Sequence, residues 1–309
     1  MPESSRYIAI GDALQSWLGA IQSGERPIRW PVGPAAWDSV AIGPGRIVLL
    51  GGAPNTGKSG LTLQWSVDAV LLNPGVRAIV ANVEMPVAVL LDRIVARLAG
   101  IDVTRLHERT LDKRELERAR RAVEKLVAVG DRLAFLMAPF TLENMATAAD
   151  AVQANLLVLD YLQRFEPPGD HRSRRESINA VMSDLRRFAD GGAAILAVAA
   201  VGRVRDKTGR NGYDAAGLNL ASFRESSELE FGADDAYLLI PDKSDENVVN
   251  LRHVKSRYGR RQDLRLRFDG PRMRFDVVPD GGEPRPRAEK REPDPDDLAA
   301  LWRNTPTAR

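Results

Sequence analysis

The sequence contains no cysteine and only three histidines in 309 residues. The lack of cysteine excludes disulfide bonds, thiolate catalysis and cysteine zinc sites, and it agrees with a cytoplasmic location. The histidines, His107, His171 and His253, are scattered along the chain. A histidine metal cluster is therefore not expected.

Long apolar runs and a strong net charge are also missing. No run approaches the roughly 20 apolar residues that span a bilayer. The first residues make a poor signal peptide, because Glu3 stands early and no long apolar core follows. We expect no membrane partner. The net charge is only +2, so any surface for nucleic acid must be local.

Apolar runs typical of buried strands alternate with helical patterns in the first two thirds of the chain. We expect strands at 47–50, 78–83, 133–136, 156–159 and 194–199, and helices at 60–72, from 86 onward, at 113–129 and at 175–189. This alternation predicts an α/β fold with right-handed crossovers and a mostly parallel sheet. Later runs follow one another without helices and predict an antiparallel C-terminal extension at 236–240, 248–254, 264–268 and 273–275.

The two ends of the chain differ from this central part. Residues 10–23 have the apolar spacing of an amphipathic helix, and the spacing alone favours packing on its own domain over packing on a neighbour. Residues 280–309 are rich in proline, glycine and charge, which is typical of a mobile tail. We therefore divide the chain into an arm at 1–28, a domain at 29–279 and a tail at 280–309.

A glycine-rich turn, Gly-Ala-Pro-Asn-Thr-Gly-Lys-Ser at 52–59, follows the first predicted strand and leads into a helix. Strand, turn and helix together are the context that a P-loop requires. Its backbone N–H groups and the helix N-terminus would bind the phosphates of ATP. Lys58 would reach the β- and γ-phosphates, and the Ser59 hydroxyl would ligate Mg²⁺. The candidate nucleotide-binding residues are Gly52, Asn55, Thr56, Gly57, Lys58 and Ser59.

Two acidic residues end other predicted strands. Asp160 follows four apolar residues, so it should face the ligand crevice at the carboxyl edge of the sheet. There it could hold Mg²⁺ beside Ser59. Glu84 follows the second strand, where a carboxylate can activate the water that attacks the γ-phosphate. Position alone leaves open whether Glu84 is only a residue before a helix.

These blocks resemble those of the DnaB-type replicative helicases. The family's Ser-Leu-Glu-Met-Pro is similar to Asn82-Val83-Glu84-Met85-Pro86, and its Asp-Tyr-Leu-Gln matches Asp160-Tyr161-Leu162-Gln163. Its Leu-Arg-Glu-Ser and Ala-Asp are similar to Phe223-Arg224-Glu225-Ser226 and Ala233-Asp234. Its Ala-Lys-Gln-Arg-Asn-Gly is similar to Val254-Lys255-Ser256-Arg257-Tyr258-Gly259, and its Leu-Arg-Phe-Asp to Leu266-Arg267-Phe268-Asp269. Ile10-Gly11-Asp12-Ala13-Leu14 resembles the start of the family's linker helix.

The resemblance implies a RecA-like ATPase core in a ring that is usually hexameric. It implies that Glu84 is the catalytic carboxylate and that Arg93 contacts the γ-phosphate in the same subunit. Lys255 and Arg257 match the finger residues that reach a neighbour's ATP. The linker-helix match also reverses the expectation for residues 10–23, which should then dock on the adjacent subunit.

Single-stranded DNA would bind at the centre of such a ring, on the loops after the fourth and fifth strands. These loops carry Arg172, Arg174 and Arg175, and then Arg203, Arg205, Lys207 and Arg210. Basic residues on loops suit the phosphate backbone and carry no sequence preference. Other replication or mobile-element proteins are further candidate partners.

Three features depart from the family. No segment resembles its N-terminal helical collar, Ala199-Ala200 stands where its fifth strand ends in Ser-Gln, and Trp30 to Trp37 replace a glycine-rich segment. Two functions therefore remain open: a collarless helicase that moves DNA with ATP, and a RecA-like recombinase, loader or regulatory ATPase. A non-enzymatic scaffold would need a broken catalytic set, and the set in this sequence is intact.

Overall fold

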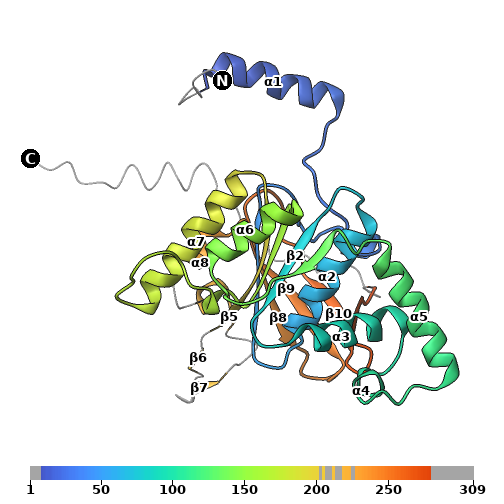
Figure 1. The fold of residues 1–309 in the computed structure, drawn as a ribbon. Coiled ribbons are helices and arrows are strands. Elements are labelled where there is room, and N and C mark those ends of the chain that lie inside the picture. The colour runs from blue at the N-terminus through green and yellow to red at the C-terminus, as the bar shows by residue number, and fades with distance from the viewer. Residues whose placement is uncertain (1–7, 202–203, 206–210, 213–217, 224–226, 280–309) are drawn as a thin grey trace, which may run out of the picture. The chain divides into compact units, whose positions relative to one another are not determined.

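The computed structural model describes residues 8–201, 204–205, 211–212, 218–223 and 227–279 (Figure 1). The helices are α1 (Ile10–Ser23), α2 (Lys58–Leu72), α3 (Val87–Ala99), α4 (Val103–His107), α5 (Lys113–Val127), α6 (Leu142–Val152), α7 (Arg174–Asp190) and α8 (Ser227–Gly232), with 3-10 turns at Ala35–Trp37, Leu162–Arg164 and Leu220–Ser222. No helix in this part of the chain is long and apolar enough to cross a membrane.

The main sheet consists of β1 (Ile47–Gly52), β2 (Ala78–Asn82), β3 (Leu133–Phe135), β4 (Leu156–Asp160), β5 (Ala194–Ala200), β8 (Asp235–Pro241), β9 (Val248–Ser256), β10 (Leu264–Asp269) and β11 (Arg274–Val277). Their spatial order is β11-β10-β9-β8-β1-β5-β4-β2-β3. Two further strands, β6 (Val204–Arg205) and β7 (Asn211–Gly212), form a separate antiparallel pair.

The parallel part of the sheet extends one strand further than the sequence predicts. We expected the antiparallel extension to begin with the strand at 236–240, but β8 runs parallel to β1 and antiparallel to β9. β8 therefore begins at the same edge of the sheet as β1, as the other parallel strands do. The predicted α/β, mostly parallel RecA-like fold is otherwise confirmed, with β9, β10 and β11 as its antiparallel extension.

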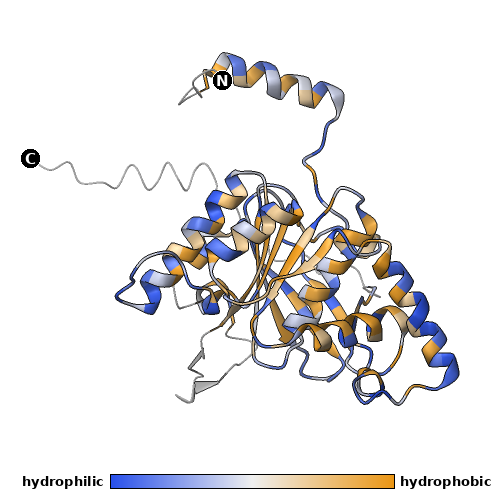
Figure 2. Ribbon diagram, viewed as in Figure 1, coloured by the Kyte–Doolittle hydropathy of each residue, from blue (hydrophilic) through white to orange (hydrophobic). Residues whose placement is uncertain are grey.

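Helices cover both faces of the sheet, because successive strand residues point to opposite sides. Val48 and Leu50 of β1 pack with α2 and α3, whereas Ile47 and Leu49 pack with α6 and α7. The strands are accordingly hydrophobic along most of their length (Figure 2). A smaller apolar cluster joins α3, α4 and α5. This two-sided burial leaves the carboxyl edge of the parallel strands as the place where polar side chains converge.

Helix α1 forms at the predicted residues, but its apolar side chains are not buried. Leu14, Trp17, Leu18 and Ile21 are 53, 60, 44 and 59% exposed, and no residue of α1 is buried. The expectation from spacing alone, that this helix packs on its own domain, is therefore wrong for the described residues. Docking on an adjacent subunit stays a prediction.

The tryptophan-rich segment before β1 closes one side of the core. Trp37 packs edge-on against Trp65 of α2 with ring centroids 5.9 Å apart, and Trp65 contacts Tyr237 of β8 in the same way at 6.0 Å. The Tyr237 hydroxyl donates to the carbonyl of Ser39 at 3.1 Å. These contacts explain the tryptophan-rich segment, for which the sequence alone offered no physical role. The segment holds α2, the helix that follows the P-loop, against the sheet.

Replacing Trp37 by alanine should lower the free energy of unfolding by about 3–5 kcal/mol, the usual cost of removing a buried aromatic side chain. Urea unfolding of dilute protein measures the change. Phe231→Ala is the control, because this aromatic side chain is 67% exposed and its loss should change stability by less than about 0.5 kcal/mol. Equal effects for the two variants would show that Trp37 does not hold the core.

Candidate nucleotide-binding site

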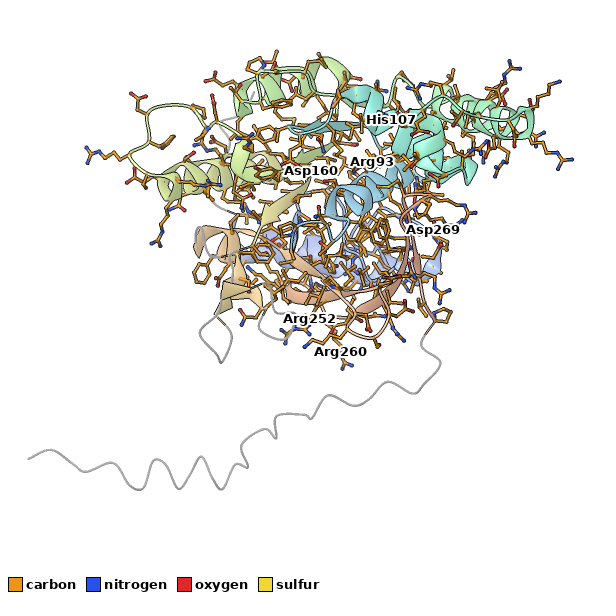
Figure 3. The ribbon with its side chains drawn as sticks, turned by 90° about the horizontal axis from the view of Figure 1, so that it is seen from below. Arg93, His107, Asp160, Arg252, Arg260 and Asp269 are labelled. Carbon is orange, nitrogen blue, oxygen red and sulfur yellow. The ribbon has the colours of Figure 1, made fainter. Side chains whose placement is uncertain are left out.

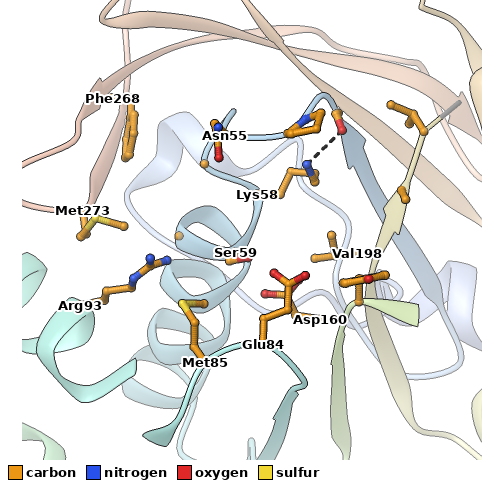
Figure 4. Close-up of a pocket in the computed structure, with 17 residues that line it drawn as sticks. Asn55, Lys58, Ser59, Glu84, Met85, Arg93, Asp160, Val198, Phe268 and Met273 are labelled. Carbon is orange, nitrogen blue, oxygen red and sulfur yellow. Dashed lines mark hydrogen bonds between the residues drawn. The ribbon is translucent and has the colours of Figure 1, made fainter. Parts of the chain in front are cut away.

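A cavity of about 480 Å³ lies at the carboxyl ends of β1, β4 and β5 (Figure 4). It is lined by Gly52, Pro54, Asn55, Gly57, Lys58, Ser59, Gly60, Glu84, Met85, Arg93, Asp160, Tyr161, Val198, Ala200, Val201, Phe268 and Met273. Segments far apart in the sequence thus meet where parallel strands are expected to place a ligand. Glu84, Arg93 and Asp160 come together here as predicted from sequence.

The turn between β1 and α2 has the backbone shape of a phosphate cradle. Asn55 and Gly57 adopt left-handed conformations, with φ of 62° and 86°. Such residues let successive backbone N–H groups point into one concavity, at the positive N-terminus of α2. Position 57 also requires glycine for space, because a Cβ atom there would lie 2.6 Å from the Phe275 ring.

The Lys58 ammonium group lies inside this turn. It donates hydrogen bonds to the carbonyl oxygens of Gly52 and Ala53 at 3.0 and 2.7 Å. Burial lowers the pKa of Lys58, while the carboxylates of Asp160 and Glu84 act to raise it. The ammonium group is therefore partly desolvated, which strengthens its interaction with an incoming phosphate.

Asp160 and Ser59 supply adjacent oxygen ligands. Burial raises the pKa of Asp160, and a hydrogen bond from Ser59 is the largest influence that lowers it. Asn82 also holds the carboxylate by donating to Asp160 Oδ2 at 2.7 Å. One carboxylate and one hydroxyl fit Mg²⁺, which is usually held by one or two carboxylates together with substrate phosphates and water.

Glu84 and Arg93 face the same cavity from the segment after β2 and from α3. The Asn82 side-chain oxygen accepts hydrogen bonds from the N–H groups of Glu84 and Met85 at 3.1 and 2.8 Å. Asn82 therefore orients both acidic residues of the site. Burial lowers the pKa of Arg93, and the charge of Asp160 acts to raise it. The guanidinium group is thus a partly buried cation near Asp160 of the metal-ligand pair (Figure 3).

One wall of the cavity is apolar. Phe268 and Met273 border the cavity there (Figure 4), and Phe268 stacks on Phe275 with ring centroids 4.3 Å apart. Gln64 of α2 ties this wall to the P-loop helix, since its side chain exchanges two 2.9 Å hydrogen bonds with the backbone of Phe275. A flat apolar wall beside a phosphate cradle can stack a nucleotide base.

Comparison with known proteins now gives the family. The family model described as the DnaB-like helicase C-terminal domain matches residues 38–277. The chain belongs to this family. Its members are ATP-hydrolysing helicases, so the chain is an ATP hydrolase. A search of curated proteins finds no match.

Solved structures agree on the fold. One, described as an ATPase domain, matches with a TM-score of 0.75 at 18% identity, over 89% of this chain and 100% of that one. A DnaB-like replicative helicase, described with its interactions with primase, matches with a TM-score of 0.73 at 18% identity, over 87% of this chain and 67% of that one. At this identity the likeness shows the fold alone.

Within this DnaB-like domain, Ala200 lines the nucleotide cavity and carries no polar side chain. Gln163, from the turn after β4, bonds to the backbone of Ala200 instead: its amide oxygen accepts from the N–H at 3.1 Å, and its nitrogen donates to the carbonyl at 3.3 Å. Gln163 thereby joins the strand that bears Asp160 to the end of β5.

The other predicted site residues lie away from the cavity or outside the described part. Thr56 is buried within the turn and donates to the carbonyl of Ala53. Lys255 and Arg257 lie at the far end of β9. Arg172 and Arg174 stand at the start of α7. Arg203, Lys207 and Arg210 lie outside the described residues, as does the side chain of Arg205.

Sequence reasoning missed Asn82, Gln163, Phe268 and Met273 as functional candidates. Three of them belong to family-like blocks that we noted for other residues. A polar residue just before or after a predicted strand end was the available signal for Asn82 and Gln163. The sequence gives no signal for Met273, because the position of this residue depends on how the β10–β11 hairpin folds back over the P-loop.

Glu84→Gln should keep ATP binding but reduce hydrolysis by about 10²-fold or more, because the amide cannot accept a proton from water. Lys58→Ala should lose both binding and hydrolysis. Equilibrium binding of a fluorescent ATP analogue and phosphate release measure the two properties. Glu143→Gln on α6 is the matched control and should change neither. Parental hydrolysis by Glu84→Gln would remove Glu84 from its catalytic role.

Proposed function

We propose that this chain is the motor domain of an oligomeric, DNA-dependent ATPase that translocates on or unwinds DNA. The observation that carries the proposal is the separation of two groups of residues. The phosphate cradle, metal ligands and Glu84 share one cavity at the edge of the sheet where the parallel strands end. Lys255 and Arg257 lie at the opposite edge, where these strands begin. A hydrolytic site complete with finger cations then requires two chains.

The hydrogen bonds of β1 define this separation. The Asp234 N–H donates to the carbonyl of Ile47, and the Arg257 N–H donates to the carbonyl of Asp234, both at 2.8 Å. Arg257 therefore lies at the edge of the sheet where β1 begins, whereas the P-loop follows the end of β1. At about 3.3 Å per residue, β1 is roughly 17 Å long, and Arg257 follows β9, which lies two strands away from β1.

The cavity supplies the groups that phosphoryl transfer to water requires. Lys58 and the N–H groups of the turn bind the β- and γ-phosphates, and Ser59 and Asp160 hold Mg²⁺, which neutralises phosphate charge when bound. Glu84 orients the attacking water and accepts its proton. Lys255 and Arg257 of a neighbour stabilise the charge that develops in the transition state. Each chain thus contributes a cradle to one site and cations to the next.

Helix α1 suits the assembly. Its stripe of Leu14, Trp17, Leu18 and Ile21 is exposed, and docking on an adjacent subunit would remove this apolar surface from water. A head-to-tail contact of this kind is heterologous and closes into a ring when the rotation allows. A hexamer is the ring we expect. The arm at 1–28, the ATPase domain at 29–279 and the tail at 280–309 remain our proposed division.

Single-stranded DNA is the proposed substrate track. Its contacts are assigned to the segments after β4 and β5, which carry Arg172 and Arg174 and then Arg203, Arg205, Lys207 and Arg210. The connection to the ATP site is short, because Asp160 ends β4 and Ala200 ends β5. DNA bound on these segments is therefore directly linked to two walls of the nucleotide cavity.

A second candidate function is favoured by Ala200. Without a polar side chain at this place in the cavity, β5 offers no side-chain hydrogen bond to a nucleotide phosphate. Coupling between ATP and the DNA segments then depends on the backbone of Ala200 and on Gln163. A recombinase, loader or regulatory ATPase needs ATP-dependent assembly but not repeated translocation, and such a protein would tolerate this arrangement.

Strand separation distinguishes the two functions. The protein with ATP and Mg²⁺ should unwind a forked duplex and hydrolyse ATP faster when single-stranded DNA is added. Lys58→Ala is the control for hydrolysis-dependent unwinding and should be inactive. ATP hydrolysis that is stimulated by single-stranded DNA without unwinding would favour the second function as a recombinase or loader. Hydrolysis that ignores DNA would contradict the helicase function and favour a regulatory ATPase.

A further inference from the structure

A second cluster of charged groups lies far from the nucleotide cavity, around the last residues of α8. Three backbone carbonyl groups at this helix end accept hydrogen bonds from three cationic side chains. Lys255 donates to Glu230 and Phe231, Arg257 donates to Phe231, and Arg186 donates to Gly232. Carbonyl groups at a helix C-terminus have no intrahelical partners and favour cations.

Arg186 and Arg257 also share a carboxylate. Within the described residues, Asp234 is the only acidic residue that accepts hydrogen bonds from both arginines, and it is 0% exposed. Its Oδ1 accepts from Arg257 at 2.8 Å, and its Oδ2 accepts from Arg186 at 2.8 Å. Oδ2 also accepts from the N–H of Ile47 at 2.8 Å. A buried carboxylate needs such partners because leaving it unpaired is costly.

The arrangement holds Arg257 without using up its donors. Within the described part of the chain, the side-chain hydrogen bonds of Arg257 involve Nη1 and Nη2, while a guanidinium group carries five N–H donors. Its side chain is 41% exposed although Asp234 is fully buried. One edge of the guanidinium group is thus anchored to the protein, and the exposed remainder can bind a phosphate bidentately.

Local charge supports binding of an anion. Three cations contact this helix end, and burial together with the charge of Arg257 lowers the pKa of Lys255, while Asp234 and Asp235 act to raise it. A buried ion pair is by itself a weak source of stability, since desolvation offsets its attraction. Such a pair can instead hold an exposed cation in one orientation.

We propose that Asp234 is a positioning residue for the arginine finger: its buried carboxylate fixes Arg257 so that the exposed guanidinium donors meet the phosphates bound to a neighbouring subunit. This inference rests on the proposed role of Arg257 toward a neighbour. Asp234 also bonds through its main chain and side chain to Ile47, the first residue of β1. The finger is therefore fixed to the strand whose other end bears the chain's own phosphate cradle.

The test is complementation between subunits. Asp234→Asn keeps the shape of the side chain but replaces one of its charged oxygens with an amide nitrogen. Alone, this variant should lose at least about tenfold in kcat, as expected when a reacting group is misplaced. Its affinity for a fluorescent ADP analogue should stay unchanged, because its own cradle is intact.

Adding an excess of Lys58→Ala protein should restore hydrolysis to Asp234→Asn. The Lys58→Ala subunits cannot hydrolyse ATP, but their Asp234 and Arg257 are intact and can serve the sites of Asp234→Asn neighbours. Arg257→Ala mixed with the same excess is the reference and should be restored likewise. Asp190→Asn is the matched control. It removes another carboxylate near Arg186, at 3.8 Å, and should retain parental kcat without any partner.

The outcomes separate the two proposals. If Arg257→Ala is restored but Asp234→Asn is not, the neighbour role of Arg257 stands and Asp234 is not its positioning residue. If neither is restored, the neighbour role falls and the inference falls with it. If Asp234→Asn does not fold, Asp234→Glu replaces it. This variant keeps the charge but displaces it by one methylene, and it should show the same loss and the same restoration.

Discussion

The length of β1 is the constraint on which the rest of this molecule depends. Its first residue is bonded to Asp234, which holds Arg257, and its last residue opens the phosphate cradle at Gly52. All six residues of β1 are buried between two helical layers, so the strand cannot shorten or bend to bring its ends together. In the function we propose, Lys255 and Arg257 act on another copy, because they lie at the edge of the sheet opposite the chain's own cradle, with the roughly 17 Å length of β1 between the two edges.

Two buried aspartates mark the ends of this arrangement, and each is held by specific partners rather than by solvent. Asp160 is fixed by Asn82 and Ser59 at the ATP end, and Asp234 is fixed by Arg186 and Arg257 at the other. Burying a carboxylate costs free energy that such contacts offset only in part. The physical benefit is geometric: both charges have one orientation, as phosphoryl transfer requires.

Local patterns predicted much of the fold and of the site. A short motif predicts the roles of Lys58 and Ser59, and four apolar residues before an acidic one predict the place of Asp160. Each of these signals lies within one short segment of the chain. The short helix α4 and the alanine-rich α6 were not predicted. The direction of β8 was not predicted either, because it depends on how the chain returns between β5 and β8 to the edge where β1 begins. The apolar wall of Phe268 and Met273 depends on bonds between Gln64 and Phe275, 211 residues apart, and no local pattern reports such a contact.

We propose that one chain alone cannot complete its hydrolytic site, and the decisive measurement is the rate of ATP hydrolysis per subunit as a function of protein concentration. We expect a low rate in dilute protein that rises steeply as subunits assemble, with a further rise when single-stranded DNA is present. A rate per subunit that stays constant from dilute monomer to assembled protein would contradict it, because each chain would then hydrolyse ATP without a neighbour.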